Sequence, residues 1–292
     1  MRQPGFFDSV CRRPALTRKE MMPLMMPLPT IRLLGFLLLS GAMASPAANA
    51  KPAANQLESV WRLGSQGLFA EAAQALPETA SSEEAVFTRA VLLLNRQPRT
   101  ETDMKNAIRI LRDLGQSSST AELRARSLFI AAQAESLQTR EQSADPTSYQ
   151  NLWHDYPQQP YGQRALVHLM LMAFDTEETR ESILARCAEL ERQADALTDQ
   201  MARSHFHQVA ARGYLYLGGQ EVKALKHLLR VNELGVARRE TLGDLHVSIG
   251  QLASEQGRPE LARTHYFEFL RLFPNDPRVY TINANLGALP IK

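Results

Sequence analysis

Cysteine, glycine and aromatic residues are all scarce in this chain of 292 residues, and each shortage narrows the possible folds. It contains 2 Cys and 15 Gly, and 7% of its residues are aromatic. A β-sandwich needs more aromatic and β-branched residues, whereas abundant Ala and Leu favour helices. Only Cys187 lies beyond the first 50 residues, so no disulfide can form within that part of the chain. We expect helix packing to provide the stability, with Cys187 as a small buried apolar residue.

Motifs of common catalytic and nucleotide-binding sites are also missing. The patterns GxGxxG, GxxxxGK, GxSxG and HExxH do not occur. His205 and His207 are the closest histidine pair, but alternate residues of a helix point about 200° apart, which is poor geometry for a shared metal. We therefore predict no enzymatic activity, no cofactor and no metal. A cell-wall enzyme is the alternative, because Glu-Ser dipeptides occur at three glutamates: Glu58, Glu135 and Glu181.

One short hydrophobic run stands near the N-terminus. Residues 33–39 read LLGFLLL, follow Arg32 and precede the small-residue stretch SGAMASPAANA. This order predicts a secretory signal peptide, cleaved after Ala44 or Ala50, and hence a periplasmic protein. A retained membrane anchor is the alternative, but the run is shorter than the roughly 20 residues that a span needs. Residues 1–50 exceed the usual signal length, so we expect translation to begin at one of four methionines: Met21, Met22, Met25 or Met26.

The basic charge of the chain belongs to that N-terminal segment. The formal net charge of the whole chain is +2, and residues 1–50 hold six basic and two acidic residues. The remaining 27 basic and 29 acidic residues give a net charge of −2. A near-neutral protein lacks the electrostatic footprint of a nucleic-acid binder.

Helical periodicity dominates residues 51–292, which we predict to be one all-α domain. Apolar residues recur at the i, i+3, i+4, i+7 spacing of one helical face, and no sustained two-residue alternation indicates a sheet. Turn signals divide the segment into helix pairs with a period of roughly 30–40 residues, which is typical of solenoids. The predicted pairs are 55–77, 82–115, 120–157, 161–196, 200–235 and 241–273, with a short capping helix after Pro277.

The segment at 249–274, IGQLASEQGRPELARTHYFEFLRLFP, resembles a tetratricopeptide repeat. That family places a small residue in the first helix, Gly near the turn, Ala and an aromatic residue on the second helix, and Pro after it. The corresponding residues are Gly250, Gly257, Ala262, Tyr266 and Pro274. Residues 61–76 and 154–174 show partial likeness, the latter to periplasmic repeat proteins of the outer-membrane assembly lipoprotein type, although this chain lacks the lipidated Cys of those proteins directly after its hydrophobic run.

The resemblance implies a right-handed solenoid of about five to six antiparallel helix pairs. Repeats of this family present a concave groove, lined by first helices, that takes up a peptide or protein segment. We therefore expect a non-catalytic scaffold or adaptor in the envelope of a diderm bacterium, with a purely structural subunit of a larger complex as another alternative. The groove residues that the resemblance implies are Gln163, Tyr216, Asp244, Val247 and Gln251.

Overall fold

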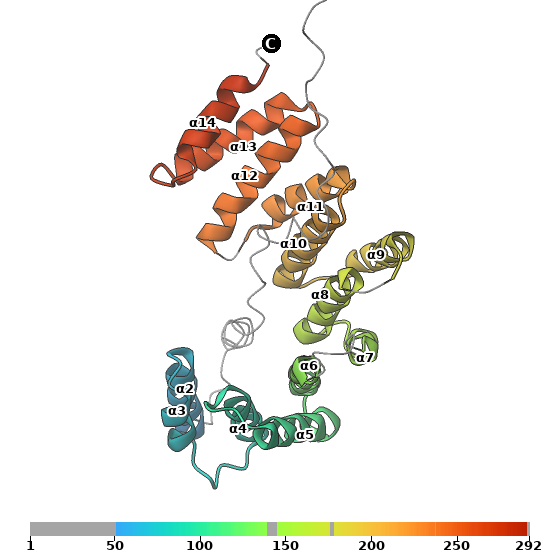
Figure 1. The fold of residues 1–292 in the computed structure, drawn as a ribbon. Helices are drawn as coiled ribbons and strands as arrows, with labels where there is room; N and C mark the ends of the chain where they lie inside the picture. The colour runs from blue at the N-terminus through green and yellow to red at the C-terminus, as the bar shows by residue number, and fades with distance from the viewer. Residues whose placement is uncertain (1–50, 139–144, 176–177, 237, 291–292) are drawn as a thin grey trace, which may run out of the picture. The chain divides into compact units, whose positions relative to one another are not determined.

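The computed structural model describes residues 51–138, 145–175, 178–236 and 238–290, and within these ranges the fold is all-α, as predicted (Figure 1). The described residues form helices and no strand. Each predicted pair range covers two helices, and the capping helix follows. The packing does not follow all of the predicted pairs, because the second helix of the 82–115 range packs against the first helix of the 120–157 range, and the second helix of the 120–157 range against the first helix of the 161–196 range. The helices are α2 (Lys51–Ser65), α3 (Phe69–Ala75), α4 (Glu83–Asn95), α5 (Glu101–Ser117), α6 (Ala121–Gln138), α7 (Thr147–Asp155), α8 (Pro160–Phe174), α9 (Arg180–Ala194), α10 (Gln200–Leu217), α11 (Glu221–Leu234), α12 (Arg239–Glu255), α13 (Pro259–Leu272) and α14 (Val279–Ala288).

The chain divides into two compact units. The first contains α2 and α3 together with Asn95–Gln97, and the second consists of Thr79–Leu94 and everything from Pro98 onward. The first helix pair of the predicted domain therefore clusters separately from the others. The predicted signal peptide, its cleavage sites and the candidate start methionines lie outside the described residues. Within the described ranges, no helix combines the length and apolar character needed to cross a membrane.

Short polar side chains start several of the helices. Thr100 Oγ1 accepts a hydrogen bond from the Asp103 amide at 3.0 Å, and Asp199 Oδ1 accepts one from the Ala202 amide at 2.7 Å. Such caps satisfy amides that have no partner inside the helix. At the other end, Gly218 and Gly257 follow α10 and α12 with φ of 68°, a conformation that glycine adopts without strain. These helix boundaries are thus set by local sequence.

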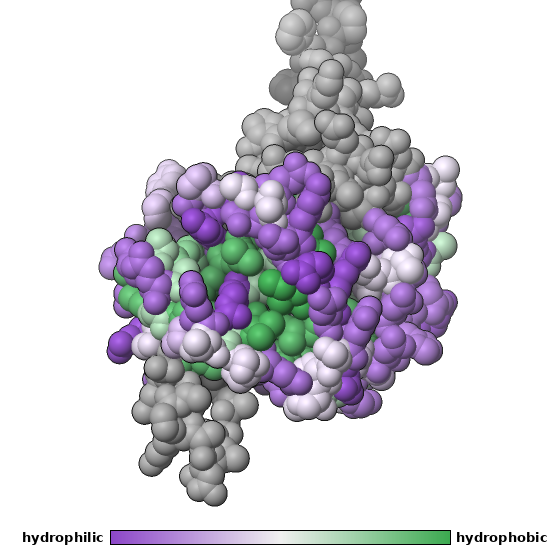
Figure 2. Space-filling view, turned by 90° about the horizontal axis from the view of Figure 1, so that it is seen from below, coloured by the Kyte–Doolittle hydropathy of each residue, from purple (hydrophilic) through white to green (hydrophobic). Residues whose placement is uncertain are grey.

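Helices of the second unit pack in series. α6 packs against α5 and α8, α8 also packs against α10, and the contacts continue from α10 through α11, α12 and α13 to α14. The core therefore extends along the series, as in an array whose units touch mainly their neighbours. On the face of the molecule that Figure 2 shows, hydrophobic residues gather in one area with hydrophilic residues around it.

Aromatic side chains fill the core at the places where small residues admit them. The ring of Phe129 lies 5.6 Å from that of Tyr161 and 6.1 Å from that of Tyr149, measured between centroids. On α12, a Cβ added to Gly250 would overlap ring carbons of Tyr266. The resemblance had placed a small residue and an aromatic at these two positions, and the structure packs them against each other.

Two successive helix pairs, α10–α11 and α12–α13, contain the same histidine contact. His207 Nδ1 lies 2.8 Å from His227 Nδ1, and His246 Nδ1 lies 2.9 Å from His265 Nδ1. The two pairs of rings are inclined at 38° and 40°. In each helix pair, one imidazole comes from the first helix and the other from the second.

A contact between helix ends repeats in the same two pairs. The side chain at the start of the first helix bonds a carbonyl at the end of the second helix, from Gln200 to Leu234 and from Arg239 to Leu272. In both kinds of contact, each residue of α10–α11 precedes its counterpart in α12–α13 by nearly the same number of positions along the chain. One translation along the sequence thus relates α10–α11 to α12–α13.

Candidate interaction surface

Three predicted groove residues lie on one face of α12. Asp244, Val247 and Gln251 follow the i, i+3, i+7 spacing, so their side chains project in similar directions. Asp244 and Gln251 are exposed and Val247 is half-buried. Gln251 Nε2 donates to Glu255 Oε1 at 3.1 Å, a contact on the helix surface. The structure therefore brings these three residues together on accessible surface.

Asp244 is paired with a cation that lies immediately before α14. Arg278 Nη1 lies 2.6 Å from Asp244 Oδ1, and the Nε and Nη2 atoms of the same guanidinium each lie 2.9 Å from a carboxylate oxygen of Asp276. The hydrogen bonds from Arg278 lower the pKa of Asp276 to about 2. The guanidinium also stands over the Phe269 ring, 5.1 Å from its centroid. The charge of Asp244 is thus largely compensated, and the α12 face offers amide and apolar groups.

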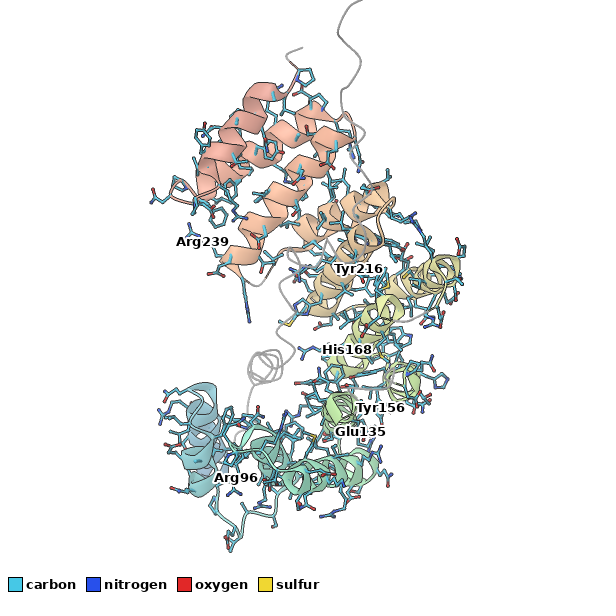
Figure 3. All side chains as sticks on the ribbon, viewed as in Figure 1. Arg96, Glu135, Tyr156, His168, Tyr216 and Arg239 are labelled. Atoms are coloured by element: carbon cyan, nitrogen blue, oxygen red, sulfur yellow. The ribbon has the colours of Figure 1, made fainter. Side chains whose placement is uncertain are left out.

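Tyr216 marks an equivalent face on α10. It is 38% exposed and lies in the last turn of the helix (Figure 3). His205, Gln208 and Arg212 share its side of the helix by spacing. The translation that relates the two helix pairs carries these three residues onto the three α12 positions. The sequence prediction missed them, although their spacing was readable. We call the six residues at 205, 208, 212, 244, 247 and 251 the first-helix face.

Gln163 does not belong to an exposed surface. It is 1% exposed, and its Oε1 accepts hydrogen bonds from the amides of Thr198 at 2.8 Å and Asp199 at 2.7 Å. Its Nε2 donates to Thr198 Oγ1 at 2.7 Å. The side chain thus joins the start of α8 to the start of α10. Its burial removes Gln163 from the predicted groove and gives it a structural role.

Replacing Gln163 by Ala is expected to lower the free energy of unfolding by about 1–2 kcal/mol. The change leaves the Thr198 and Asp199 amides without their acceptor, and a lost bond at a buried site costs more than one at the surface. Urea denaturation monitored by circular dichroism measures the difference. Gln116→Ala on α5, where the glutamine is exposed, is the matched control and should change stability by less than about 0.5 kcal/mol. Equal effects of the two substitutions would contradict the role of Gln163.

A buried polar network joins α9, α10 and α11 behind the first-helix face. Tyr214 donates its hydroxyl hydrogen to Glu191, whose Oε1 lies 3.5 Å from His227 Nε2. Burial opposes ionisation of Glu191, but hydrogen bonds from His227 and Tyr214 outweigh it and lower the pKa to about 2. Burial lowers the pKa of His207 to about 4, so this imidazole is neutral at pH 7. The network is a packed connection between helices, and every polar atom named here has a partner.

The residues considered for chemistry are not assembled into a reactive centre. His207 pairs with His227 and not with His205, and the described residues contain no group of three or more His, Cys, Asp or Glu that could hold a metal ion. Cys187 is fully buried, as predicted, and burial raises the pKa of its thiol to about 12. The three glutamates of the enzyme alternative lie on three different helices: Glu58 on α2, Glu135 on α6 and Glu181 on α9.

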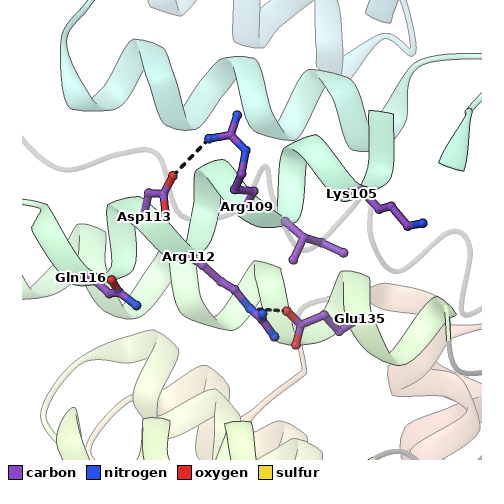
Figure 4. A pocket seen from close by; sticks show the side chains of 7 residues that line it. Lys105, Arg109, Arg112, Asp113, Gln116 and Glu135 are labelled. Atoms are coloured by element: carbon purple, nitrogen blue, oxygen red, sulfur yellow. Dashed lines mark hydrogen bonds and ion pairs between the residues drawn. The ribbon is translucent and has the colours of Figure 1, made fainter. Parts of the chain in front are cut away.

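An open hollow of about 380 Å³ lies on α5 and α6 (Figure 4). Three cations line it, and each has a carboxylate partner. Arg112 Nε lies 2.7 Å from Glu135 Oε1, Arg109 Nη1 lies 3.4 Å from Asp113 Oδ2, and Lys105 Nζ lies 2.6 Å from Glu101 Oε1. Because these pairs compensate the charges locally, the hollow has no uncompensated group that would define a ligand.

Comparison with known proteins adds no family. No protein-family model matches the sequence, and no curated protein matches it significantly. The first-helix face and its surroundings are therefore the structural basis for a functional proposal.

Proposed function

We propose that this protein is a non-catalytic scaffold or adaptor that binds a peptide or protein segment along the first helices of a tetratricopeptide-like solenoid. The observation that carries the proposal is the repetition between α10–α11 and α12–α13. The same imidazole pair and the same helix-end contact recur at nearly the same separation along the chain. The positions of the first-helix face correspond by the same translation, although the residues at them differ.

Repetition of this kind supports a binding surface for an extended partner. Each helix pair buries its apolar side against its neighbours and leaves one equivalent face accessible. Corresponding positions on successive first helices would offer an extended partner segment contacts at a regular interval. Such contacts require accessible side chains, and four residues on these helices are exposed: Arg212, Tyr216, Asp244 and Gln251. We further propose that the second unit is a right-handed solenoid of antiparallel helix pairs.

We place the protein in the periplasm as part of the same proposal. The support is the sequence of residues 1–50, with its short apolar run and its small-residue cleavage sites after Ala44 or Ala50. A partner would then be another protein of the cell envelope. The enzyme alternative is less well supported, because Glu58, Glu135 and Glu181 lie on separate helices.

Partner capture by matched valine variants tests the proposal. Val247→Glu places a charge on the first-helix face, and Val222→Glu places the same charge on α11, where Val222 is 71% exposed. Tagged full-length chains are expressed in the source cells, and captured proteins are quantified by mass spectrometry. We expect Val247→Glu to reduce capture of a reproducible partner at least about tenfold, which corresponds to about 1.4 kcal/mol, and Val222→Glu to preserve it. Equal capture by both variants, or no partner for the wild type, would contradict the proposal.

A further inference from the structure

Arg164 is a buried cation without a carboxylate partner. It lies on α8, is 7% exposed, and has no hydrogen-bond partner for Nε or Nη1 among the described residues. Its Nη2 contacts the sulfur of Met201, at 3.7 Å, and its guanidinium stands 4.7 Å from the centroid of the Tyr161 ring. An unpaired buried charge is costly, and natural proteins keep such groups where they serve a ligand or a switch. The Nε and Nη1 groups of Arg164 therefore lack a hydrogen-bond acceptor that a ligand could supply.

Arg164 lies where α8 and α10 pack together. Burial lowers the pKa of His205 on α10, the charge of Arg164 lowers it further, and the carboxylate of Asp199 raises it. That carboxylate accepts a hydrogen bond from the Ala202 amide and caps α10. Neither α8 nor α10 contains an acidic residue. An incoming anion would therefore meet no competing carboxylate from within these two helices.

Met201 is the hydrogen-bonding neighbour of the Arg164 guanidinium. Its thioether covers Nη2 and is itself half-buried. An unbranched thioether changes rotamer readily, and sulfur is a weak acceptor that a carboxylate can replace. Met201 and His205 are four residues apart on α10, so Met201 lies on the side of this helix that contains the first-helix face. A carboxylate there could form charge-assisted hydrogen bonds with the guanidinium.

We propose that Arg164 is a subsite for a carboxylate of an acidic partner segment that lies along α10. This subsite depends on the proposed scaffold function, and it implies that the partner segment of the scaffold is acidic. The ligand is a peptide carboxylate because the subsite adjoins the surface proposed to hold a peptide. Binding exchanges the Met201 contact for hydrogen bonds to the guanidinium, and no covalent step is involved.

Fluorescence anisotropy of a labelled hexaglutamate amide with the purified full chain tests the subsite. We expect the wild type to bind this probe in preference to hexalysine, Arg164→Met to weaken binding about tenfold or more, and Arg164→Lys to weaken it less. The matched control is Arg126→Met. Arg126 also stands over an aromatic ring, Phe87 at 4.2 Å, but it has a carboxylate partner, with Nη2 2.5 Å from Glu84 Oε2. The control should retain the wild-type affinity.

Thermal unfolding of the same variants separates ligand binding from structural support. Arg164→Met should keep or raise the melting temperature, because it removes an uncompensated buried charge, whereas Arg126→Met should lower it. Unchanged hexaglutamate binding by Arg164→Met, or no binding by the wild type, would overturn the subsite. Complete displacement of the probe by an equal concentration of inorganic phosphate would overturn its assignment to a peptide. None of these results decides the scaffold proposal, which the valine variants test separately.

Discussion

Lowering the pH from 7 to 5 is expected to reduce the free energy of unfolding by about 2–4 kcal/mol. Burial lowers the pKa of His168, His207 and His265 to about 4, and it also lowers the pKa of His205 and His246. In the unfolded chain a histidine has a pKa near 6.5. Between pH 6.5 and 4 the unfolded chain therefore binds more protons than the folded one, and stability falls as the pH falls. Each histidine contributes up to about 1.4 kcal/mol per pH unit.

Charged neighbours act on these histidines without reversing the direction. His207 faces His227, Arg230 and Arg203, which lower its pKa further, and Glu191, which raises it. His265 faces His246, which lowers its pKa, and Glu268, which raises it. The paired carboxylates titrate in a separate pH range. The pKa of Glu191 and that of Asp276 are lowered to about 2, so their contribution is lost only as the pH falls below that of an unfolded carboxyl, about 4. The interval from pH 7 to 5 thus reports mainly on histidine.

Urea denaturation at pH 7, 6 and 5 measures this dependence. Replacing both His246 and His265 by Leu should flatten the slope by removing one buried pair, even if stability at pH 7 also changes. The control is His154→Gln on α7, whose side chain is 87% exposed and pairs with Asp155 at the surface. It should leave the slope unchanged. A slope of zero in the wild type would show that the imidazole pairs are not buried as described.

Replacing Gly250 by Leu is expected to cost about 3 kcal/mol of unfolding free energy. A Cβ at this position would overlap the ring of Tyr266, which is 1% exposed and has little room to move. The gain in helix propensity from removing a glycine is only about 1 kcal/mol and cannot offset the overlap. Because α12 and α13 meet here, the substitution forces the two helices apart.

Gly287→Leu on α14 is the matched control for the packing prediction. No atom lies within 4 Å of a Cβ added at this glycine, which is also helical and exposed. The control should be neutral or should stabilise the protein by up to about 1 kcal/mol. Thermal and urea denaturation compare the two variants. A stable Gly250→Leu variant would contradict the close approach of α12 and Tyr266.

Local signals in the sequence were sufficient to predict the helices. Apolar residues at helical spacing, together with turn glycines such as Gly218 and Gly257, placed two helices in each predicted range. The burial of Cys187 was predicted for the same reason, since its neighbours follow a helical pattern. The division into two units was not predicted, because it depends on which helices touch and not on the pattern within each helix.

The exposure and the partners of individual polar residues could not be predicted from the sequence, because they depend on tertiary structure. Gln163 is polar and stands near the start of a helix, so sequence favoured an exposed position, but its partners come from the start of α10. The imidazole pairs were also missed. His168, His207 and His246 stand at equal intervals along the chain, which was a readable signal, but the partners of the last two come from neighbouring helices. The unpaired state of Arg164 can be seen only when its surroundings are known.

The most direct test of the central claim is site-specific photocrosslinking in the source cells. A photoreactive amino acid replaces Gln251 on the first-helix face of α12 in one strain and Lys226 on the exposed side of α11 in another. If the first helices bind an envelope partner, position 251 should form a discrete crosslinked product with one protein, and position 226 should not. Crosslinking of the same partner at position 226 alone, or at neither position, would contradict a scaffold that binds through its first helices.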